Sequence, residues 1–211
     1  MNSEKDRFSV VMTVCDNAQE LESNLPVYLG QEYEPGYKVI VVDESSTDGT
    51  EDVLKLQKQE HPHLYTTFLP KPNLHAKRRM ISLSIGVKAA ASKWVILTDI
   101  NYVPSSAEWL KQTDDVIEST TELLLGYSVK KGLKLQSFDH LETGLRLIKK
   151  NERKGYNGKN AHRLKFLRGH YDFIAVPITR VQDVLHSFEQ DVSGHRLLGL
   201  RIGVICHNLF S

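Results

Sequence analysis

Residues 38–51 read Lys38-Val39-Ile40-Val41-Val42-Asp43-Glu44-Ser45-Ser46-Thr47-Asp48-Gly49-Thr50-Glu51. The β-branched run 39–42 is typical of a strand that is buried on both faces of a parallel sheet. The polar turn after it contains Asp48, and Glu51 follows three residues later, which is the spacing of a helix N-cap and capping box. The stretch therefore predicts a buried strand, a turn and then a helix.

Two acidic residues, Asp43 and Glu44, stand where this predicted strand ends. Open α/β sheets bind ligands just beyond the carboxyl ends of their strands. Asp43 and Glu44 are therefore the first candidates for a binding site. The alternative is a solvated turn that does no more than lead into a well-capped helix.

The order of strand, turn and helix repeats along the first 120 or so residues. Strands are expected at 8–15, 64–69 and 94–98, and helices at about 17–29, 51–60, 75–91 and 105–121. Pro26 should kink the first helix or end it early, and Ile81 and Ile85 have the spacing of core residues in the third. Further strands are expected at 123–129 and 172–178. This rhythm predicts βαβ units and hence an α/β fold with a mostly parallel sheet.

Composition narrows the class of protein. The chain has 211 residues, 40% hydrophobic and 25% charged, as expected for a single globular domain. A net charge of +1 argues against a nucleic-acid partner bound by bulk charge. The two cysteines, Cys15 and Cys206, form no disulfide framework, which suits a reducing, cytoplasmic setting. The polar N-terminus is not a signal peptide, and no apolar run approaches the ~20 residues of a spanning helix.

A second strand end also carries polar side chains. The strand expected at 94–98 leads into Asp99-Ile100-Asn101. Because the carboxyl ends of parallel strands meet at one edge, Asp99 should lie near Asp43 and Glu44. Carboxylate and amide oxygens are ligands that Mg²⁺ and Mn²⁺ accept. An isolated Asp-x-Asn sequence is common in proteins, so these residues form either a metal site or an ordinary polar loop.

These motifs together resemble a GT-A-fold, family-2 nucleotide-sugar glycosyltransferase of the type found in bacterial surface-polysaccharide synthesis. The resemblance rests on residues 9–13, 41–50 and 96–104 and is closest over 8–127. It implies a GT-A (Rossmann-like), mostly parallel sheet flanked by helices, in a single domain over 1–211. Residues 8–127 would bind the donor, and residues 128–211 would form the acceptor and catalytic half. The implied reaction moves a sugar, with inversion, from a UDP-sugar to a carbohydrate or lipid-linked acceptor.

The resemblance also assigns roles at the nucleotide. Thr13 and Asp16, at the end of the first strand, would lie near the nucleotide, and Asp43 with Glu44 would hold its base. The family commonly has Asp-Asp at the latter pair, and the longer Glu44 is expected to change the contacts with the base.

By the same resemblance, Asp99 and Asn101 would hold Mn²⁺ or Mg²⁺ and the diphosphate. His207 falls where some enzymes of this fold place a third metal ligand; a structural role for His207 is the alternative. The family usually has Asp-x-Asp here. The neutral amide of Asn101 removes one negative charge, so the metal should bind more weakly than usual.

Arginines lie between the two strand ends, in Lys77-Arg78-Arg79 at the start of the third predicted helix. Arg78 and Arg79 are candidates for the diphosphate, because a guanidinium matches phosphate with two parallel hydrogen bonds. A solvated helix face is the alternative.

Past residue 130, the resemblance points to Glu189-Gln190-Asp191. It makes Asp191 the base that takes the proton of the acceptor hydroxyl, with Glu189 as the second choice; an acidic cluster at a helix end is the alternative. Residues 149–165 hold seven Lys or Arg against one acid, Glu152. They form either a solvated loop or a basic lip for an anionic acceptor at a membrane surface. The chain ends at Ser211, early for this family, so we expect an acceptor site that is incomplete, supplied by a partner or lost with a truncated end.

Three other functions are compatible with an α/β domain that has acidic residues at its strand ends. A nucleotidyltransferase should have a glycine-rich basic loop near its N-terminus, but residues 8–17 contain no glycine. A phosphoacceptor receiver domain is shorter and lacks an acid so far downstream. A degenerate nucleotide-sugar-binding module without turnover is the more serious rival, because Asn101 and the early end of the chain both favour it.

Overall fold

The structure, a computed structural model, describes residues 6–70, 78–129, 172–182, 184–185 and 202–208. Within these residues the helices are α1 (Ala18–Leu29), α2 (Thr50–Glu60), α3 (Arg78–Ala89) and α4 (Trp109–Asp115). The strands are β1 (Phe8–Val14), β2 (Tyr37–Asp43), β3 (Leu64–Phe68), β4 (Trp94–Leu97), β5 (Leu123–Val129), β6 (Phe173–Pro177) and β7 (Ile202–Asn208).

The described strands form a seven-stranded sheet in the order β3-β2-β1-β4-β6-β5-β7. The first four are parallel, and Val11 of β1 pairs with Ile40 of β2 and Leu97 of β4. Strand β6 runs antiparallel to both β4 and β5, and β7 is parallel to β5. The predicted α/β fold with a mostly parallel sheet is confirmed, and the carboxyl ends of β1, β2 and β4 lie at one edge.

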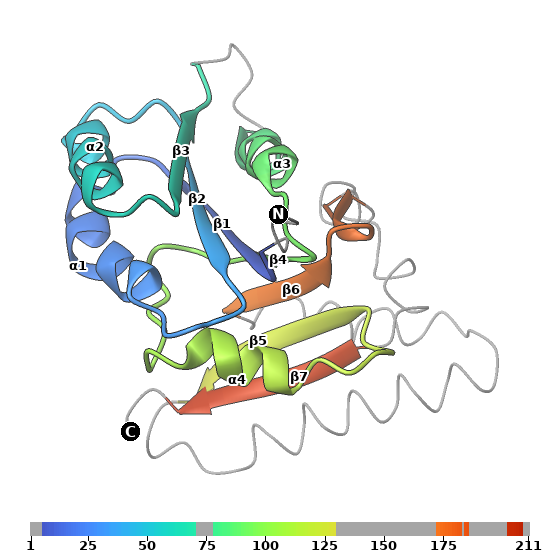
Figure 1. The fold of residues 1–211 in the computed structure, drawn as a ribbon. Helices are drawn as coiled ribbons and strands as arrows, with labels where there is room; N and C mark the ends of the chain where they lie inside the picture. Colours follow the sequence, from blue (N-terminus) through green and yellow to red (C-terminus); the bar gives the residue numbers. More distant parts are fainter. Residues whose placement is uncertain (1–5, 71–77, 130–171, 183, 186–201, 209–211) are drawn as a thin grey trace, which may run out of the picture.

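Helices cover both faces of the parallel half (Figure 1). Helices α1 and α2 lie on one face, where Leu21 and Leu25 share a core with Met12 of β1 and Val41 of β2. Helix α3 lies on the opposite face, where Leu83 and Val87 pack with Val11 and Ile40. Because successive side chains of a buried strand point to opposite faces, both faces need apolar residues. This explains the unbroken apolar run of β2.

Several local expectations were wrong. Pro26 does not end the first helix early: α1 continues to Leu29, which is the end expected from the apolar pattern. Ile81, expected in the core, is 42% exposed, and Leu83 and Val87 are buried instead. Helix α4 is shorter than predicted: Glu108, not Ser105, precedes its first residue, and it ends at Asp115.

The capping box predicted for α2 does not form. Gly49 is the N-cap, and Asp48 lies one residue before it. Glu51 forms an ion pair with Lys55, 2.8 Å away, one turn later in the same helix. The Asp48 carboxylate has other partners, which belong to the site described below.

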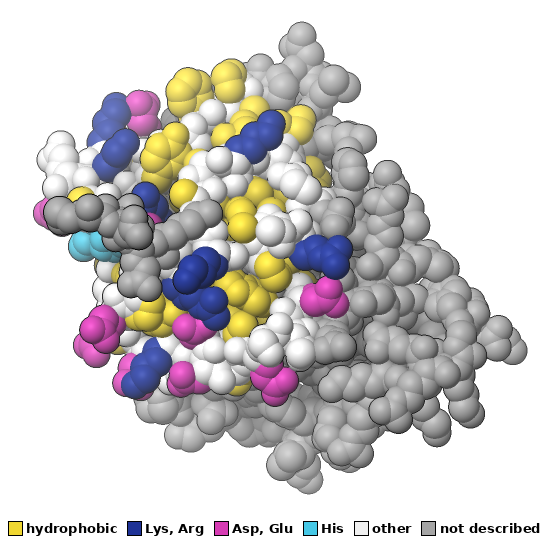
Figure 2. Space-filling model, turned by 45° about the vertical axis from the view of Figure 1, so that its right-hand side comes forward, with side chains coloured by type: hydrophobic (Ala, Val, Ile, Leu, Met, Phe, Trp, Pro, Cys, Tyr) yellow, Lys and Arg dark blue, Asp and Glu magenta, His cyan; other side chains and the backbone are white. Residues whose placement is uncertain are grey.

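Acidic and basic side chains alternate over the face drawn in Figure 2, with no large area of one sign among the described residues. This agrees with the near-neutral net charge. Among the helices that the structure describes, none is both long and apolar enough to cross a membrane.

Candidate functional site

Three loops meet at the carboxyl edge of the parallel strands: residues 15–17 after β1, 44–49 after β2 and 98–102 after β4. Val14 of β1 pairs with Asp43, and the N–H of Thr98 donates to the carbonyl of Val11 on the other side of β1. Asp43 and Asp99 therefore flank β1 with roughly 10 Å between the two strands that carry them. The structure thus brings the two predicted acidic positions to one edge; their binding roles remain predictions.

The loops after β1 and β2 are joined by side-chain hydrogen bonds. Asp43 Oδ1 accepts from the backbone N–H of Ser46 at 2.9 Å and from its hydroxyl at 2.6 Å. Asp16 donates its N–H to Ser46 Oγ at 2.9 Å and accepts the N–H of Thr47 at 2.6 Å. Asp16 and Ser45 have φ values of +53° and +60°, a left-handed conformation that is uncommon for residues with a side chain. These hydrogen bonds hold both loops in one arrangement.

Asp48 links the first turns of two helices. Its Oδ2 accepts the N–H of Ala18 in α1 at 3.0 Å, and its Oδ1 accepts the N–H of Thr50 in α2 at 3.0 Å. Hydrogen bonds from the Thr50 side chain, and then from these backbone groups, lower the pKa of Asp48 below its usual value. A carboxylate is also favoured near helix N-termini by the helix dipole. Asp48 is therefore a structural residue of this edge.

Three other predicted contacts for the nucleotide have defined places. Thr13 is partly buried on β1 opposite Val42. Asp43 and Glu44 are only 9% and 8% exposed. The N–H of Glu44 donates to the carbonyl of Val14 at 2.8 Å, which keeps the two strands paired to this point. Two nearly buried acidic residues thus stand at the rim of the sheet.

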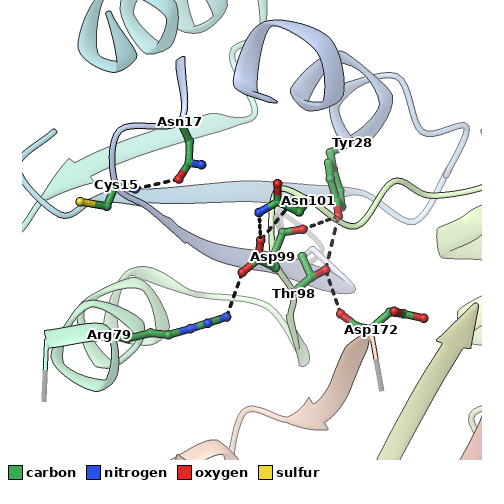
Figure 3. A network of polar contacts seen from close by, with 8 residues as sticks. All are labelled: Cys15, Asn17, Tyr28, Arg79, Thr98, Asp99, Asn101 and Asp172. Atoms are coloured by element: carbon green, nitrogen blue, oxygen red, sulfur yellow. Dashed lines mark hydrogen bonds and ion pairs between the residues drawn. The ribbon is translucent and has the colours of Figure 1, made fainter. Parts of the chain in front are cut away.

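Asp99 lies at the centre of a polar network (Figure 3). Its Oδ2 accepts from Arg79 Nη2 at 3.0 Å. Its Oδ1 accepts from the Asn101 side-chain amide at 2.8 Å and from the Asn101 backbone N–H at 3.1 Å. Arg79 comes from the first turn of α3 and reaches across the edge to the loop after β4. Two of the predicted ligands and one predicted arginine are therefore in direct contact.

The Asp99 loop is supported from beneath by α1. The Tyr28 hydroxyl donates to the carbonyl of Tyr102 at 2.6 Å and lies 3.2 Å from the carbonyl of Asp99 and 3.3 Å from Thr98 Oγ1. The Asn24 amide donates to the carbonyl of Ile100 at 2.9 Å. Burial raises the pKa of Tyr28, which therefore keeps its proton for these contacts. Tyr28 is not among the site residues predicted from the sequence; its hydroxyl is the signal that could have found it, because a buried tyrosine usually has a polar partner.

The predicted metal site does not fit the described residues. Both oxygens of Asp99 accept from nitrogen atoms, and the Asn101 side chain presents its NH₂ group, not its oxygen, to that carboxylate. No group of three or more His, Cys, Asp or Glu able to hold an ion occurs in the described ranges. His207 is on β7, three strands from β4, and its side chain lies outside the described residues. The Mn²⁺ or Mg²⁺ cofactor and its ligands remain predictions.

Other predicted residues lie outside the described part of the chain. These are the catalytic candidates Asp191 and Glu189 and the basic segment 149–165. Arg78 is the first residue of α3, but its side chain also lies outside the described residues.

The sequence of this chain matches the model of a known protein family. The family model described as glycosyl transferase family 2 matches residues 9–166, which include all three loops and most of the chain. The chain belongs to glycosyl transferase family 2. No curated protein sequence matches it significantly.

Solved structures show the same fold as this family-2 domain. The mannosyltransferase PcManGT from Pyrobaculum calidifontis, in complex with GDP-Man and Mn²⁺, has 16% identity and a TM-score of 0.61 and covers 98% of this chain. TarS residues 1–349 of S. aureus, in complex with UDP, have 19% identity and a TM-score of 0.50 over 61% of this chain. This chain spans 57% of the PcManGT chain and 37% of the TarS chain.

An enzyme with a different name shares the fold. The 4-diphosphocytidyl-2C-methyl-D-erythritol synthase from Anaerococcus prevotii has 11% identity and a TM-score of 0.57, and the match covers 95% of this chain and 87% of that one. Since one fold serves several chemistries, the structural likenesses confirm the GT-A-type architecture only. The family-2 assignment comes from the sequence match. Inversion, donor, acceptor and the surface-polysaccharide role remain predictions.

Proposed function

We propose that this family-2 domain transfers a sugar, with inversion, from a UDP-sugar to a carbohydrate or lipid-linked acceptor. The observation that carries the proposal is the shared edge of β1, β2 and β4. There the nearly buried Asp43 and Glu44 and the Arg79–Asp99 pair flank β1, inside the range that matches the family. This edge of an open α/β sheet is where ligands bind.

The two sides of the edge suit different parts of a nucleotide sugar. Carboxylates accept hydrogen bonds, so Asp43 and Glu44 would receive the N–H groups of the base, with Thr13 and Asp16 beside them. A guanidinium donates hydrogen bonds and carries positive charge, so Arg79 would face the diphosphate. The donor would then lie across the end of β1.

The chemistry then needs one base. Asp191 takes the proton of the acceptor hydroxyl, and the oxygen of that hydroxyl attacks the anomeric carbon from the side opposite the diphosphate. The bond between the anomeric carbon and the diphosphate breaks at the same time. The bonding pair leaves with the nucleoside diphosphate, and attack from the opposite side inverts the configuration. Glu189 is the second candidate for the base.

We further propose a cytoplasmic location at the inner face of a membrane. The support is the lack of a disulfide framework and the seven Lys or Arg of residues 149–165, which would attract an anionic, lipid-linked acceptor.

A second candidate function is nucleotide-sugar binding without turnover. Asn101 favours this candidate, because it stands where the family usually has a carboxylate and its side-chain amide donates a hydrogen bond to Asp99.

The test combines binding with turnover. Nucleoside diphosphates at about 100 times their dissociation constant should raise the free energy of unfolding by about 2.7 kcal/mol. Wild type supplied with UDP-sugars should release UDP, whereas Asp191→Asn should keep binding and lose release. Binding without release by wild type would favour the second candidate. Failure of wild type to bind any nucleoside diphosphate would rule out both.

A further inference from the structure

Asp99 already has a cationic partner. Its side chain is 37% exposed and forms an ion pair with the 64% exposed side chain of Arg79, with 3.0 Å between Asp99 Oδ2 and Arg79 Nη2. The other oxygen accepts two hydrogen bonds from Asn101. All the donors around this carboxylate that the structure describes are nitrogen groups.

This arrangement opposes a divalent ion at the same place. Mg²⁺ and Mn²⁺ need several oxygen ligands. Three of the roughly four acceptor sites of the Asp99 carboxylate are used by these nitrogen donors. An ion at Asp99 would have to share the carboxylate with the guanidinium or displace it, and the Asn101 amide would have to turn its oxygen inward to become a ligand. The ion would also approach a positive charge, at a cost that increases as water is excluded by the donor.

We propose that Arg79 takes the place of the divalent cation, so that donor binding at this edge does not depend on a metal. The guanidinium, positioned by Asp99, would bind the donor's diphosphate and balance the charge of the nucleoside diphosphate as it leaves. Asp99 is then a positioning residue, not a metal ligand. This inference rests on the proposed function, because it requires a nucleotide-sugar donor.

The geometry of arginine suits both contacts at once. A guanidinium has five N–H donors in a fixed plane. Among the described residues Asp99 is its ion-pair partner, through Nη2, and the other nitrogens can bind phosphate oxygens with two parallel hydrogen bonds. Lysine could supply the charge but not this planar pair of contacts.

The experiment measures binding of UDP and GDP by calorimetry, in EDTA and in Mn²⁺, to the full chain. Arg79→Met removes the charge and keeps the length of the side chain. Arg180→Met is the matched control, since Arg180 also forms an exposed ion pair, 3.1 Å from Glu122. Strand β6 runs antiparallel to β4, and its last residue, Pro177, pairs with Trp94 at the start of β4. Arg180 follows Pro177 and therefore lies at the edge of the sheet opposite Asp99.

We expect the wild-type dissociation constant for the bound nucleotide to differ by less than about twofold between EDTA and Mn²⁺. Arg79→Met should weaken binding in EDTA at least about tenfold, as expected for loss of hydrogen bonds to a charged group, and Arg180→Met should not.

Wild-type binding that disappears in EDTA would overturn the inference and leave the proposed function standing. Equal binding by wild type and Arg79→Met in EDTA would also overturn it. If wild type binds neither nucleotide in either buffer, the proposed function fails, and the inference fails with it.

Discussion

The hydroxyl of Tyr28 lies 2.6 Å from the backbone oxygen of Tyr102, which connects α1 to the loop that carries Asp99 and Asn101. Tyr28 is fully buried, and its ring packs edge-on against Trp109 with 5.8 Å between the ring centres. The position of the polar edge is therefore set partly from the core.

Tyr28→Phe should destabilise the fold and weaken nucleotide binding. The ring stays, but the backbone oxygens of Asp99 and Tyr102 lose a donor, at a cost of about 1–3 kcal/mol in the free energy of unfolding. Chemical denaturation measures this loss, and calorimetry with UDP and GDP measures the binding.

Tyr37→Phe is the matched control for Tyr28→Phe. The Tyr37 hydroxyl donates to the carbonyl of Leu29 at 2.7 Å, but Tyr37 begins β2 and so lies at the edge opposite Asp99. It should lose stability and keep its nucleotide affinity. Equal loss of affinity in both variants would show that Tyr28 has no specific effect on the Asp99 loop.

Asp48→Asn should be destabilising at neutral pH and nearly neutral in acid. Because the pKa of Asp48 is lowered in the folded state, its ionised form stabilises the fold at pH values above the unfolded pKa of about 4. That stabilisation is lost as the pH falls through the lower folded value. Urea denaturation of wild type and variant between pH 7 and pH 2.5 measures the difference.

Asp52→Asn is the control for this pH series, because it removes a charge from the same first turn of α2. Its effect should stay within about 0.5 kcal/mol at every pH. A gap between wild type and Asp48→Asn that does not shrink in acid would contradict the assigned role of Asp48.

The strands of the parallel half could be predicted because their signal is local. The apolar run of β2 and the polar residues after it are contiguous, and a rule for parallel sheets then brings Asp43 and Asp99 to one edge. The antiparallel β6 could not be placed in this way, because it pairs with β4 across more than 70 residues of chain.

Two of the wrong local predictions, at Pro26 and at Asp48, have the same cause, which is that tertiary contacts outweighed local preference. A proline inside a helix costs about 3 kcal/mol, yet Leu25, Tyr28 and Leu29 around Pro26 are buried in the core and keep α1 helical. Asp48 has the spacing of an N-cap, but the sheet brings the start of α1 within reach, so one carboxylate serves two helices. Sequence spacing alone cannot show the second helix.

The roles of the arginines also needed coordinates. The sequence offers Arg78 and Arg79 as equal candidates, and only the packing of α3 against β1 and β2 shows that Arg79 reaches Asp99. The same contact changes the meaning of Asp99, from an expected metal ligand to the partner of a guanidinium.

Gly86→Ala should destabilise the fold, because α3 packs closely on the sheet at this residue. A Cβ on Gly86 would lie 2.5 Å from Val11 Cγ1 and 3.1 Å from Val42 Cγ2. Overpacking of this kind costs about 1–3 kcal/mol, offset by up to about 1 kcal/mol of helix propensity. Thermal and chemical denaturation measure the net loss.

Gly49→Ala is the matched control for Gly86→Ala, since a Cβ there would meet Ala18 Cβ at an ordinary 3.7 Å. It should change stability by only a few tenths of a kcal/mol to about 1 kcal/mol. A Gly86→Ala protein as stable as wild type would show that α3 can move away from β1 without cost.

Asn101→Asp should make nucleotide binding depend on metal. The substitution removes the amide that donates to Asp99 Oδ1 at 2.8 Å and leaves two like charges side by side, which a divalent cation relieves by binding both carboxylates. Mn²⁺ should then strengthen binding of UDP or GDP at least about tenfold over EDTA, equivalent to about 1.4 kcal/mol. Asn17→Asp adds the same charge in the loop after β1, where Asn17 Oδ1 accepts the N–H of Cys15, and should gain no such dependence. If Asn101→Asp binds nucleotide equally in EDTA and Mn²⁺, the prediction is wrong, and the missing second carboxylate does not explain why this edge holds no metal.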